Sequence, residues 1–450
     1  MASLIVLAGD SLEIKGLSYL KFLKSIKSDF QGTLRHLGHK HSPVIKFKLM
    51  GKQWYYFTTP KAVEYILKKN VKNFSKDFLR SALGPIMGEG ILLTEGKRWA
   101  AQRRNVSKSF HYKTFSTLLP WITDFTQKSI QSFEDKELDF HFEMNQLILS
   151  ISTKTFLGED VDSSQANELQ FCVPIYSKLS AQLLRRPFRT PRWFPLPSNL
   201  KMKDIERRLT LVADLIIEKR RVQIANGHTS NDALTLLLLN SKEVSQKELQ
   251  HQVITFLAAG SETTANMLTW TISLLAQNPD IVLKLQSEIE SVLGDEPLGL
   301  DHLDKLHFTN AIMQESMRIY PIVAGLGRQV VSDDTIEGVD VKAGSIVYVS
   351  QFSMHIDPKY WTSPMEFKPE RFLNPDKTQD DFTAFFPFSL GPRVCVGESI
   401  ALMFGKIVLT SLYRKHTFIL NPDQKLDHQS DITLIPKFGL HGKLKPLSSH

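Results

Sequence analysis

The feature that most constrains the fold is one long helical pattern in the second half of the chain. It begins at Ser245, which has the spacing of a capping box with Glu248, and it ends at Gln277, ahead of an Asn-Pro pair. These 33 residues would form an α-helix about 50 Å long. A helix of that length has to cross the whole molecule, so the other elements must pack around it. Polar residues between Gly260 and Thr264 interrupt its apolar side chains, which argues against a membrane span.

The rest of the chain is mostly helical with a few short strands. Val44 to Leu49 and Trp54 to Thr58 predict a hairpin, whereas the periodicity from Trp99 to about Arg220 is mainly that of helices. Further helices are expected from Thr309 to Tyr320 and from Gly397 to about Tyr413. No linker or repeat divides the 450 residues. We therefore expect a single domain, 1–450, that is mainly α with a small β part.

Composition excludes several classes of protein. The chain carries 55 Lys and Arg against 47 Asp and Glu, a net charge of +8. A nucleic-acid binder would combine such charge with aromatic or groove-reading motifs, and since the sequence contains none, no nucleic-acid partner is expected. Two cysteines are too few for a disulfide scaffold and suit a reducing cytosol, so the expected location is cytoplasmic.

The N-terminal residues carry no recognisable targeting signal. Met1 to Gly9 are apolar over too short a stretch to cross a bilayer, and no signal-peptide pattern follows. We expect no transmembrane segment. Ile14 to Ile26 is amphipathic and rich in lysine. Its preferred interpretation is a helix packed on its own domain, and contact with a membrane surface is the alternative.

The most informative segment surrounds Cys395. Phe388, Gly391, Arg393 and Gly397 stand at fixed distances around this cysteine, with a proline at position 392. Two glycines and a proline indicate a tight loop whose backbone N–H groups can point at the sulfur. The helix that begins after Gly397 would stabilise a thiolate further. The other cysteine, Cys172, has no flanking glycines and is interpreted as a buried structural thiol.

The segment from Phe388 to Gly397 resembles the haem-binding loop of cytochrome P450, F-x-x-G-x-R-x-C-x-G. The resemblance implies that Cys395 is the axial thiolate ligand of a haem iron, and that Phe388 and Gly397 lie beside the cofactor. It also implies that Arg393 pairs with a haem propionate. Thiolate ligation favours cleavage of the O–O bond. The implied cofactor is haem b, with O2 as co-substrate and electrons that derive from NAD(P)H.

The middle of the long helix resembles the oxygen-activation motif of the same family. Ala259 and Gly260 match its small residues, which leave room beside the iron, and Glu262 and Thr263 match its acid–alcohol pair. The resemblance implies that Glu262 and Thr263 are the catalytic residues that deliver protons. A threonine hydroxyl in this position can also bond a helix carbonyl and open the helix locally.

Three further motifs fit the resemblance. Glu315 and Arg318 match E-x-x-R, and with Arg371 of the Pro-Glu-Arg-Phe segment they imply a structural charge network that supports the haem loop. The other two motifs concern the cofactor: Trp99 and Arg103 match W-x-x-x-R, which contacts a haem carboxylate, and Arg328 occupies the position of another arginine that binds a propionate.

Together these motifs imply a cytochrome P450 fold whose long central helix crosses the molecule over the haem. The expected protein is a soluble, bacterial-type haem-thiolate monooxygenase that hydroxylates or epoxidises an apolar substrate. A peroxide-driven peroxygenase and a non-catalytic haem sensor are the alternatives. The retained Glu-Thr pair favours the monooxygenase. Family analogy nominates four residues for the substrate cavity wall: Leu257, Ala324, Leu326 and Phe438.

Electrons are expected from a separate protein, since only 55 residues follow Cys395 and leave no room for a fused reductase. An acidic ferredoxin, flavodoxin or reductase would be attracted to basic residues on the helix that carries Trp99. These residues are Lys97, Arg98, Arg104 and Lys108. The enzyme is expected to be a monomer.

Overall fold

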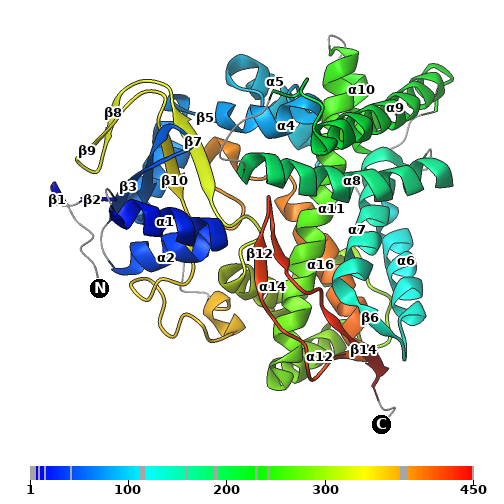
Figure 1. Ribbon diagram of the computed structural model, residues 1–450. Coiled ribbons are helices and arrows are strands. Elements are labelled where there is room, and N and C mark those ends of the chain that lie inside the picture. The colour runs from blue at the N-terminus through cyan, green and yellow to red at the C-terminus, as the bar shows by residue number, and fades with distance from the viewer. Residues whose placement is uncertain are drawn as a thin grey trace.

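The computed structural model describes residues 7–8, 11–14, 17–40, 43–110, 117–158, 161–185, 191–228, 232–240, 244–374 and 384–447. Figure 1 shows a β-rich part, which contains the N-terminal segments, beside a larger helical part. The strands β3 and β10 lie in the first part, and the long helix α11 (Gln246–Ala276) lies in the second.

The β-rich part is built on one mixed sheet of seven short strands. Their order is β1 (Leu7–Ala8), β2 (Ser11–Glu13), β3 (Val44–Leu49), β4 (Lys52–Phe57), β10 (Ile346–Val349), β7 (Leu326–Val330) and β5 (Phe74–Ser75). The predicted hairpin forms as β3 and β4, with Val44 opposite Phe57. Met50 and Gly51 both have positive φ, which matches the twist that a two-residue hairpin turn requires.

Two helices cover this sheet, namely α1 (Leu17–Ser28) and α2 (Phe30–Lys40). Phe22 of α1 and Leu34 of α2 are buried against Ile45 and Phe47 of β3. The amphipathic N-terminal segment therefore packs on its own domain. No helix within the described residues is both long enough and apolar enough to cross a membrane.

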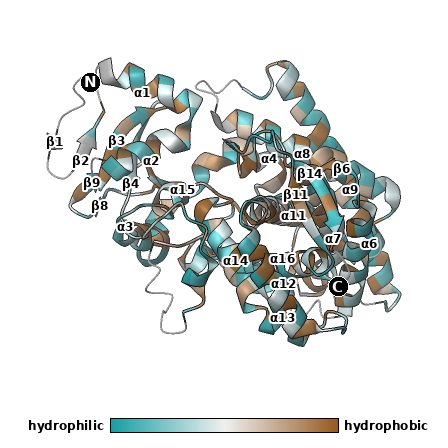
Figure 2. Ribbon diagram, turned by 90° about the horizontal axis from the view of Figure 1, so that it is seen from below, coloured by the Kyte–Doolittle hydropathy of each residue, from teal (hydrophilic) through white to brown (hydrophobic). Residues whose placement is uncertain are grey.

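Helices of the larger part surround α11. In Figure 2, seen from below, α7, α14 and α16 are grouped around α11. The helices of this part are α4 (Arg80–Met87), α5 (Gly96–Ser109), α6 (Leu119–Ser132), α7 (Phe140–Leu157), α8 (Ser163–Arg185), α9 (Pro197–Ala225), α10 (Ala233–Asn240), α11, α12 (Pro279–Leu293), α13 (Leu300–Lys305), α14 (His307–Ile319) and α16 (Glu398–Tyr413).

The remaining short elements complete the molecule. They are α3 (Pro60–Glu64), α15 (Gln351–Met354), β6 (Glu137–Asp139), β8 (Asp334–Ile336), β9 (Val339–Val341), β11 (His416–Leu420), β12 (His428–Ser430), β13 (Leu434–Pro436) and β14 (His441–Pro446). After α3 the chain widens into a π-helix, Tyr65–Lys69.

The long helix has the predicted ends to within one residue, with Ser245 as its N-cap and Gln277 as its C-cap. The Ser245 hydroxyl accepts a hydrogen bond from the Glu248 N–H at 3.2 Å. The second half of the predicted capping box does not form. The Glu248 carboxylate instead pairs with Arg98 of α5 at 2.8 Å, because a guanidinium is a stronger partner for a carboxylate than a backbone N–H.

Candidate active site

The loop around Cys395 is held in shape by its own backbone. The Cys395 N–H donates to the Phe388 carbonyl at 2.9 Å, and the Val394 N–H donates to the Gly391 carbonyl at 3.1 Å. Gly391 has a φ of 70° and packs against the Leu67 backbone of the π-helix, where a β-carbon would clash. The loop leads into α16, with Gly397 as the N-cap.

The Cys395 side chain can be reached by solvent although much of the protein surrounds it. This burial raises the pKa of its thiol. A hydrogen bond from the Gly397 N–H and the charges of Arg103 and Lys76 act in the opposite direction and favour the thiolate. The sulfur is thus enclosed by donors and cations while one side stays open to a ligand.

The middle of α11 is open in the same way. Ala259 is exposed and Thr263 is half-buried, whereas Leu249 and the residues of α11 from His251 to Leu257 and from Thr264 to Leu275 are buried. Thr263 Oγ1 donates to the Ala259 carbonyl at 2.5 Å. This is the hydroxyl–carbonyl bond that the motif predicts.

Gly260 does not face the same side as Ala259. A β-carbon on Gly260 would lie 2.8 Å from the Phe156 ring of α7, so this glycine permits close packing of two helices. Its predicted place beside the iron stays a prediction. Successive residues of an α-helix point about 100° apart, so neighbouring small residues serve different faces.

Four cationic side chains gather beside the cysteine loop: Lys76, Arg103, Arg328 and Arg393. Arg103 Nη1 donates to the Val394 carbonyl at 2.7 Å. The Arg393 guanidinium lies 4.1 Å from the centre of the Trp99 ring and pairs with Glu95. The structure thus brings Trp99, Arg103, Arg328 and Arg393 together, as the motifs predict.

The charges of this cluster are not balanced within the described residues. Burial and the charge of Arg328 hold the pKa of Lys76 well below its usual range, and burial and Arg393 lower the pKa of Arg328 to about 10. Glu95 is the carboxylate that offsets them. Nη1 of Arg393 is buried and has no hydrogen-bond partner in the part of the chain that the structure describes.

A ligand with two carboxylates beside the cysteine sulfur would correct this imbalance. Haem b carries two propionates and an iron that binds thiolate, so the residues present fit this cofactor. Sequence reasoning missed two members of the cluster, Lys76 and Glu95. Glu95 stands four residues before Trp99, at the spacing of one helix face, which was a usable signal. Nothing in the sequence around Lys76 distinguishes it from a surface lysine.

The structure joins Glu315, Arg318 and Arg371 in one buried network. Arg318 donates to both carboxylate oxygens of Glu315, at 2.7 and 2.8 Å, and Arg371 Nε donates to Glu315 Oε1 at 3.2 Å. The remaining Arg318 donors reach the carbonyls of His355, Pro364 and Glu366. Glu315 and Arg318 are both fully buried.

His355 connects this network to the cysteine loop. Its Nδ1 lies 3.3 Å from the Met317 carbonyl of α14, and its Nε2 accepts from the Phe386 N–H at 3.0 Å, two residues before Phe388. Burial lowers the pKa of His355 to about 3, so the ring is neutral. A neutral imidazole can donate at one nitrogen and accept at the other, which both contacts require.

The four residues nominated for the substrate cavity occupy different environments. Leu257 is fully buried in the core, because it lies on the face of α11 opposite Ala259; its nomination is therefore wrong. Ala324 is buried against Phe352 and Leu434. Leu326 is half-buried, and Phe438 is 45% exposed beneath the Lys437 ammonium.

The basic residues near Trp99 differ in how freely they can meet a partner. Lys97 and Arg104 are exposed. Arg98 pairs with Glu89 and Glu248, so its charge is partly offset within the protein. The side chain of Lys108 lies outside the described residues.

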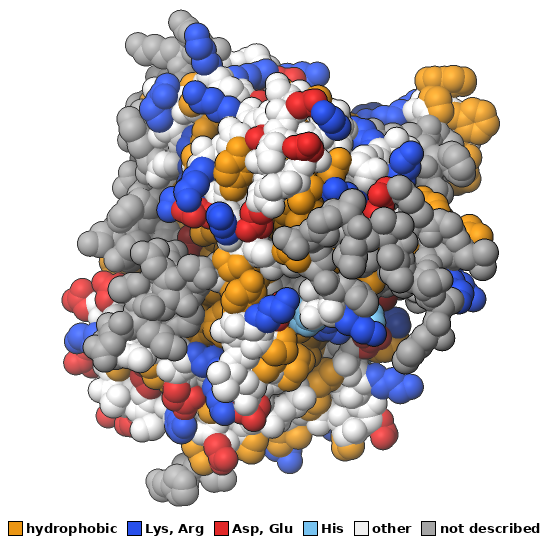
Figure 3. Space-filling view, turned by 90° about the vertical axis from the view of Figure 1, so that its left-hand side faces the viewer, with side chains coloured by type: hydrophobic (Ala, Val, Ile, Leu, Met, Phe, Trp, Pro, Cys, Tyr) orange, Lys and Arg blue, Asp and Glu red, His pale blue; other side chains and the backbone are white. Residues whose placement is uncertain are grey.

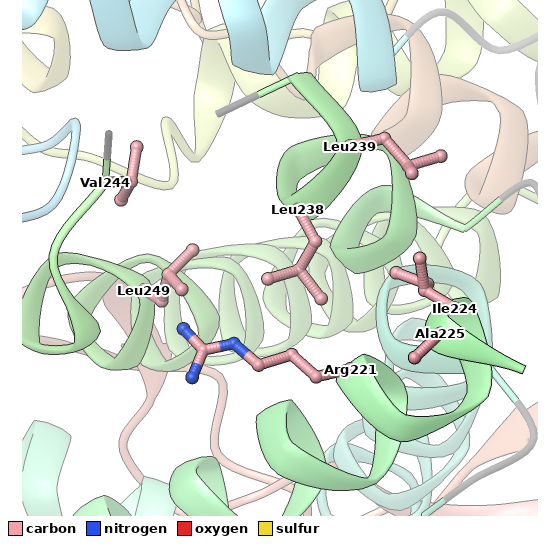
Figure 4. Close-up of a pocket in the computed structure, with 7 residues that line it drawn as sticks. All are labelled: Arg221, Ile224, Ala225, Leu238, Leu239, Val244 and Leu249. Carbon is pink, nitrogen blue, oxygen red and sulfur yellow. The ribbon is translucent and has the colours of Figure 1, made fainter. Parts of the chain in front are cut away.

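A separate hollow of about 350 Å³ lies between α9, α10 and the start of α11 (Figure 4). Leu238, Leu239 and Leu249 form much of its lining, and Arg221 is its charged residue. Arg221 Nη1 donates to Glu218 at 2.6 Å, so its charge is already matched.

Comparison with known proteins identifies the family. The model of the cytochrome P450 family matches residues 16–441, and the chain belongs to this family. The protein is accordingly a haem-thiolate monooxygenase, and the predicted fold class, mainly α with a small β part, is confirmed. Its cofactor is haem b, with O2 as co-substrate.

Named relatives come from plants and mammals. The chain is 28% identical over 388 residues to protein LUTEIN DEFICIENT 5, chloroplastic, of Arabidopsis thaliana; the match covers 81% of this chain and 65% of that protein. It is 27% identical to cytochrome P450 4V2 of Mus musculus, over 90% of this chain and 83% of the relative. It is 29% identical to 11-oxo-beta-amyrin 30-oxidase of Glycyrrhiza uralensis, over 82% of this chain and 75% of the relative.

Proposed function

We propose that the Cys395 thiolate would hold the haem iron of this monooxygenase, which inserts one atom of O2 into an apolar organic substrate. The observation that carries the proposal is the unbalanced cation cluster beside the Cys395 sulfur. Bound haem supplies an iron centre that activates dioxygen with electrons derived from NAD(P)H. The chain's own residues hold the cofactor, exclude water and deliver protons.

The proposed cofactor contacts divide between sulfur and carboxylates. The Gly397 N–H and the charge of Arg103 stabilise the Cys395 thiolate. Arg103, Arg328, Arg393 and Lys76 would share the two propionates, and Trp99 would support Arg393 through its ring. Glu315, Arg318 and Arg371 do not contact the cofactor site directly. His355 links them to the loop near Phe388, because its carbonyl accepts from Arg318 and its Nε2 accepts from the Phe386 N–H.

Glu262 and Thr263 are proposed to move protons toward the open face of α11. The Thr263 hydroxyl donates to the Ala259 carbonyl, so its oxygen lone pairs remain available to a water or ligand in the opening. Glu262 directly precedes Thr263 in the same turn and is half-buried, so its carboxylate can be reached from solvent. Ala259 leaves space next to Thr263.

We propose a separate acidic electron donor of the ferredoxin, flavodoxin or reductase type. Lys97 and Arg104 are the exposed basic residues near Trp99 that support this docking site. The substrate is proposed to be lipid-like, a class that includes fatty acids, terpenoids and steroids. One relative is named as an oxidase of 11-oxo-beta-amyrin. Ala324, Leu326 and Phe438 remain candidates for its contacts.

The enzyme is proposed to act as a single-domain, cytoplasmic monomer of the bacterial type. Its two cysteines support a reducing compartment. Contact with an anionic membrane surface is a secondary proposal, supported by exposed Leu20, Lys21, Lys24 and Lys27 on α1. Figure 3 looks onto this side of the molecule and shows basic, acidic and hydrophobic side chains intermixed. Flotation with anionic and with neutral vesicles tests this contact.

Turnover with a surrogate ferredoxin and its reductase tests the proposed function. We expect NADPH-dependent oxygenation of an apolar probe such as dodecanoic acid, and we expect substrate binding to shift the haem absorption. A peroxygenase would form the same product from hydrogen peroxide alone and gain nothing from NADPH. A haem sensor would bind haem and consume no NADPH with any member of a panel of fatty acids, terpenoids and steroids.

A further inference from the structure

A chain of hydrogen bonds runs from α7 to the carboxylate of Glu262. The Thr433 hydroxyl donates to Glu262 Oε1 at 2.5 Å. Asn266 Nδ2 donates to Thr433 Oγ1 at 3.1 Å, and Asn266 Oδ1 lies 2.9 Å from Nε2 of His141. Asn266 is fully buried and Thr433 is 4% exposed, so water has little access to the middle of the chain.

Each residue in this series of hydrogen bonds determines whether its neighbour donates or accepts. Because the Asn266 amide nitrogen donates to Thr433, the amide oxygen faces His141, whose Nε2 must carry a proton and donate. The Thr433 oxygen accepts from Asn266, which leaves its one proton for Glu262. All three donors thus point toward Glu262. This direction suits an ionised carboxylate, which can only accept hydrogen bonds.

The backbone around Thr433 is anchored independently of Glu262. The Leu434 N–H donates to the Ile322 carbonyl at 2.7 Å, and Trp270 Nε1 of α11 donates to the Leu434 carbonyl at 3.0 Å. The Trp270 ring in turn stacks on Tyr320, with ring centres 4.0 Å apart. Figure 1 shows the red C-terminal strands beside α11. This arrangement brings Thr433 to Glu262, although the two residues are 171 positions apart in the sequence.

We infer that Thr433, Asn266 and His141 are positioning residues that hold the Glu262 carboxylate in the orientation from which it delivers protons. This inference rests on the proposed role of Glu262. The chain does not conduct protons itself, because the Asn266 amide does not ionise at neutral pH. Protons therefore reach Glu262 from the solvent-accessible side of α11 and not through His141.

Four single variants and one double variant of the holoenzyme test this inference. Thr433→Val removes the hydroxyl at nearly constant volume, Thr433→Ser retains it, and Glu262→Gln removes the acid. Thr269→Val is the matched control, since Thr269 is fully buried on the same helix but its hydroxyl donates to the Ala265 carbonyl at 2.8 Å. The surrogate ferredoxin system supplies electrons, no substrate is added, and NADPH oxidation and peroxide release are followed in H2O and in D2O.

We expect Thr433→Val to slow NADPH oxidation roughly tenfold and to change the peroxide yield and the solvent isotope effect in the same direction as Glu262→Gln. Thr433→Ser and Thr269→Val should stay close to the wild type. The double variant Glu262→Gln/Thr433→Val should equal Glu262→Gln alone, because a residue that acts through Glu262 adds nothing once the acid is gone. Crystals of Thr433→Val should show the Glu262 carboxylate displaced.

Two negative outcomes separate the inference from the function on which it rests. If Glu262→Gln is defective but Thr433→Val behaves like Thr269→Val and leaves the carboxylate in place, the positioning role is overturned alone. If Glu262→Gln itself leaves the rate, the peroxide yield and the isotope effect unchanged, the proton-delivery role of Glu262 is overturned and the inference fails with it.

Discussion

At the scale of single residues, the buried Glu315–Arg318 pair is the clearest case of a charge that depends on its partner. Both side chains are fully buried, and Arg318 satisfies its remaining donors with backbone carbonyls. Arg318→Met would leave Glu315 buried with a weaker set of donors. We expect it to lower the free energy of unfolding by about 3–5 kcal/mol. Denaturant titration measures this loss.

The exposed pair of Lys128 and Asp124 provides the control for that experiment. Its atoms are 2.7 Å apart, but both side chains lie mostly in solvent. Lys128→Met should leave the unfolding free energy nearly unchanged, because exposed ion pairs contribute little. Similar losses for Arg318→Met and Lys128→Met would contradict the account of the buried network.

Arg328 should have opposite effects on the protein with and without haem. In the apoprotein its buried charge opposes Arg393, and removing it by Arg328→Met should raise the unfolding free energy by about 1 kcal/mol. In the holoprotein the same change removes a propionate partner, so haem should transfer faster to apomyoglobin. Arg207→Met, at an exposed position, serves as the control. If Arg328→Met changed apoprotein stability and haem retention in the same direction, a propionate role for Arg328 would be contradicted.

Single residues also show how far sequence can lead to a site. Trp99, Arg103 and Arg393 were predictable because each belongs to a spaced motif, and the structure brings them together. Lys76 was not predictable, since its role depends on a fold that places it beside Arg328 and Cys395. Leu257 was misassigned because sequence proximity to Ala259 does not say which face of the helix a side chain occupies.

At the scale of elements, the start of α11 depends on its N-cap. The Ser245 hydroxyl accepts from the Glu248 N–H, while the Glu248 side chain is engaged by Arg98 and does not complete the box. Ser245→Ala should lower the unfolding free energy by about 1 kcal/mol. Ser245→Asp should keep the wild-type unfolding free energy, because an aspartate can accept the same cap hydrogen bond. Equal losses for both variants in thermal unfolding would show that the cap hydrogen bond is not what stabilises this end.

The contact between α14 and the cysteine loop should weaken in acid. His355 has a pKa near 3 in the folded protein against an ordinary value of 6.5, so below pH 6.5 the unfolded chain binds a proton that the folded chain excludes. Stability therefore falls as the pH drops from about 6.5 toward 3, by up to about 4 kcal/mol from this residue. Above pH 6.5 it contributes no pH dependence.

The variant His355→Gln isolates this contribution. A glutamine can still accept from the Phe386 N–H but cannot take up a proton, so its unfolding free energy should depend less steeply on pH between 6.5 and 4. Urea titrations at several pH values measure the difference. Equal slopes for the variant and the wild type would contradict the buried, neutral state of His355.

Elements with a strong local signal were predicted well, and those that depend on tertiary contacts were not. The ends of α11 and the β3–β4 hairpin follow from caps, periodicity and a turn that the sequence displays. The π-helix Tyr65–Lys69 carries no such signal. Its backbone packs against Gly391, a contact between residues that are distant in sequence.

At the scale of the whole molecule, the architecture explains why the site is both enclosed and reachable. The helix α11 is buried along most of its length by α7, α14 and α16, yet Ala259 and Thr263 in its middle remain accessible, as does Cys395. The cations beside Cys395 leave charge that haem propionates would balance. These observations converge on one claim, that the sulfur of Cys395 binds the haem iron.

The carbon-monoxide difference spectrum of the dithionite-reduced protein tests that claim most directly. Cys395→Ser is the test variant, and Cys172→Ser, which changes the buried thiol on α8, is the matched control. We predict a strongly red-shifted Soret band for the wild type and for Cys172→Ser, and its loss in Cys395→Ser. A band at the position of histidine-ligated haem in the wild type, or a red-shifted band that survives in Cys395→Ser, would contradict the account.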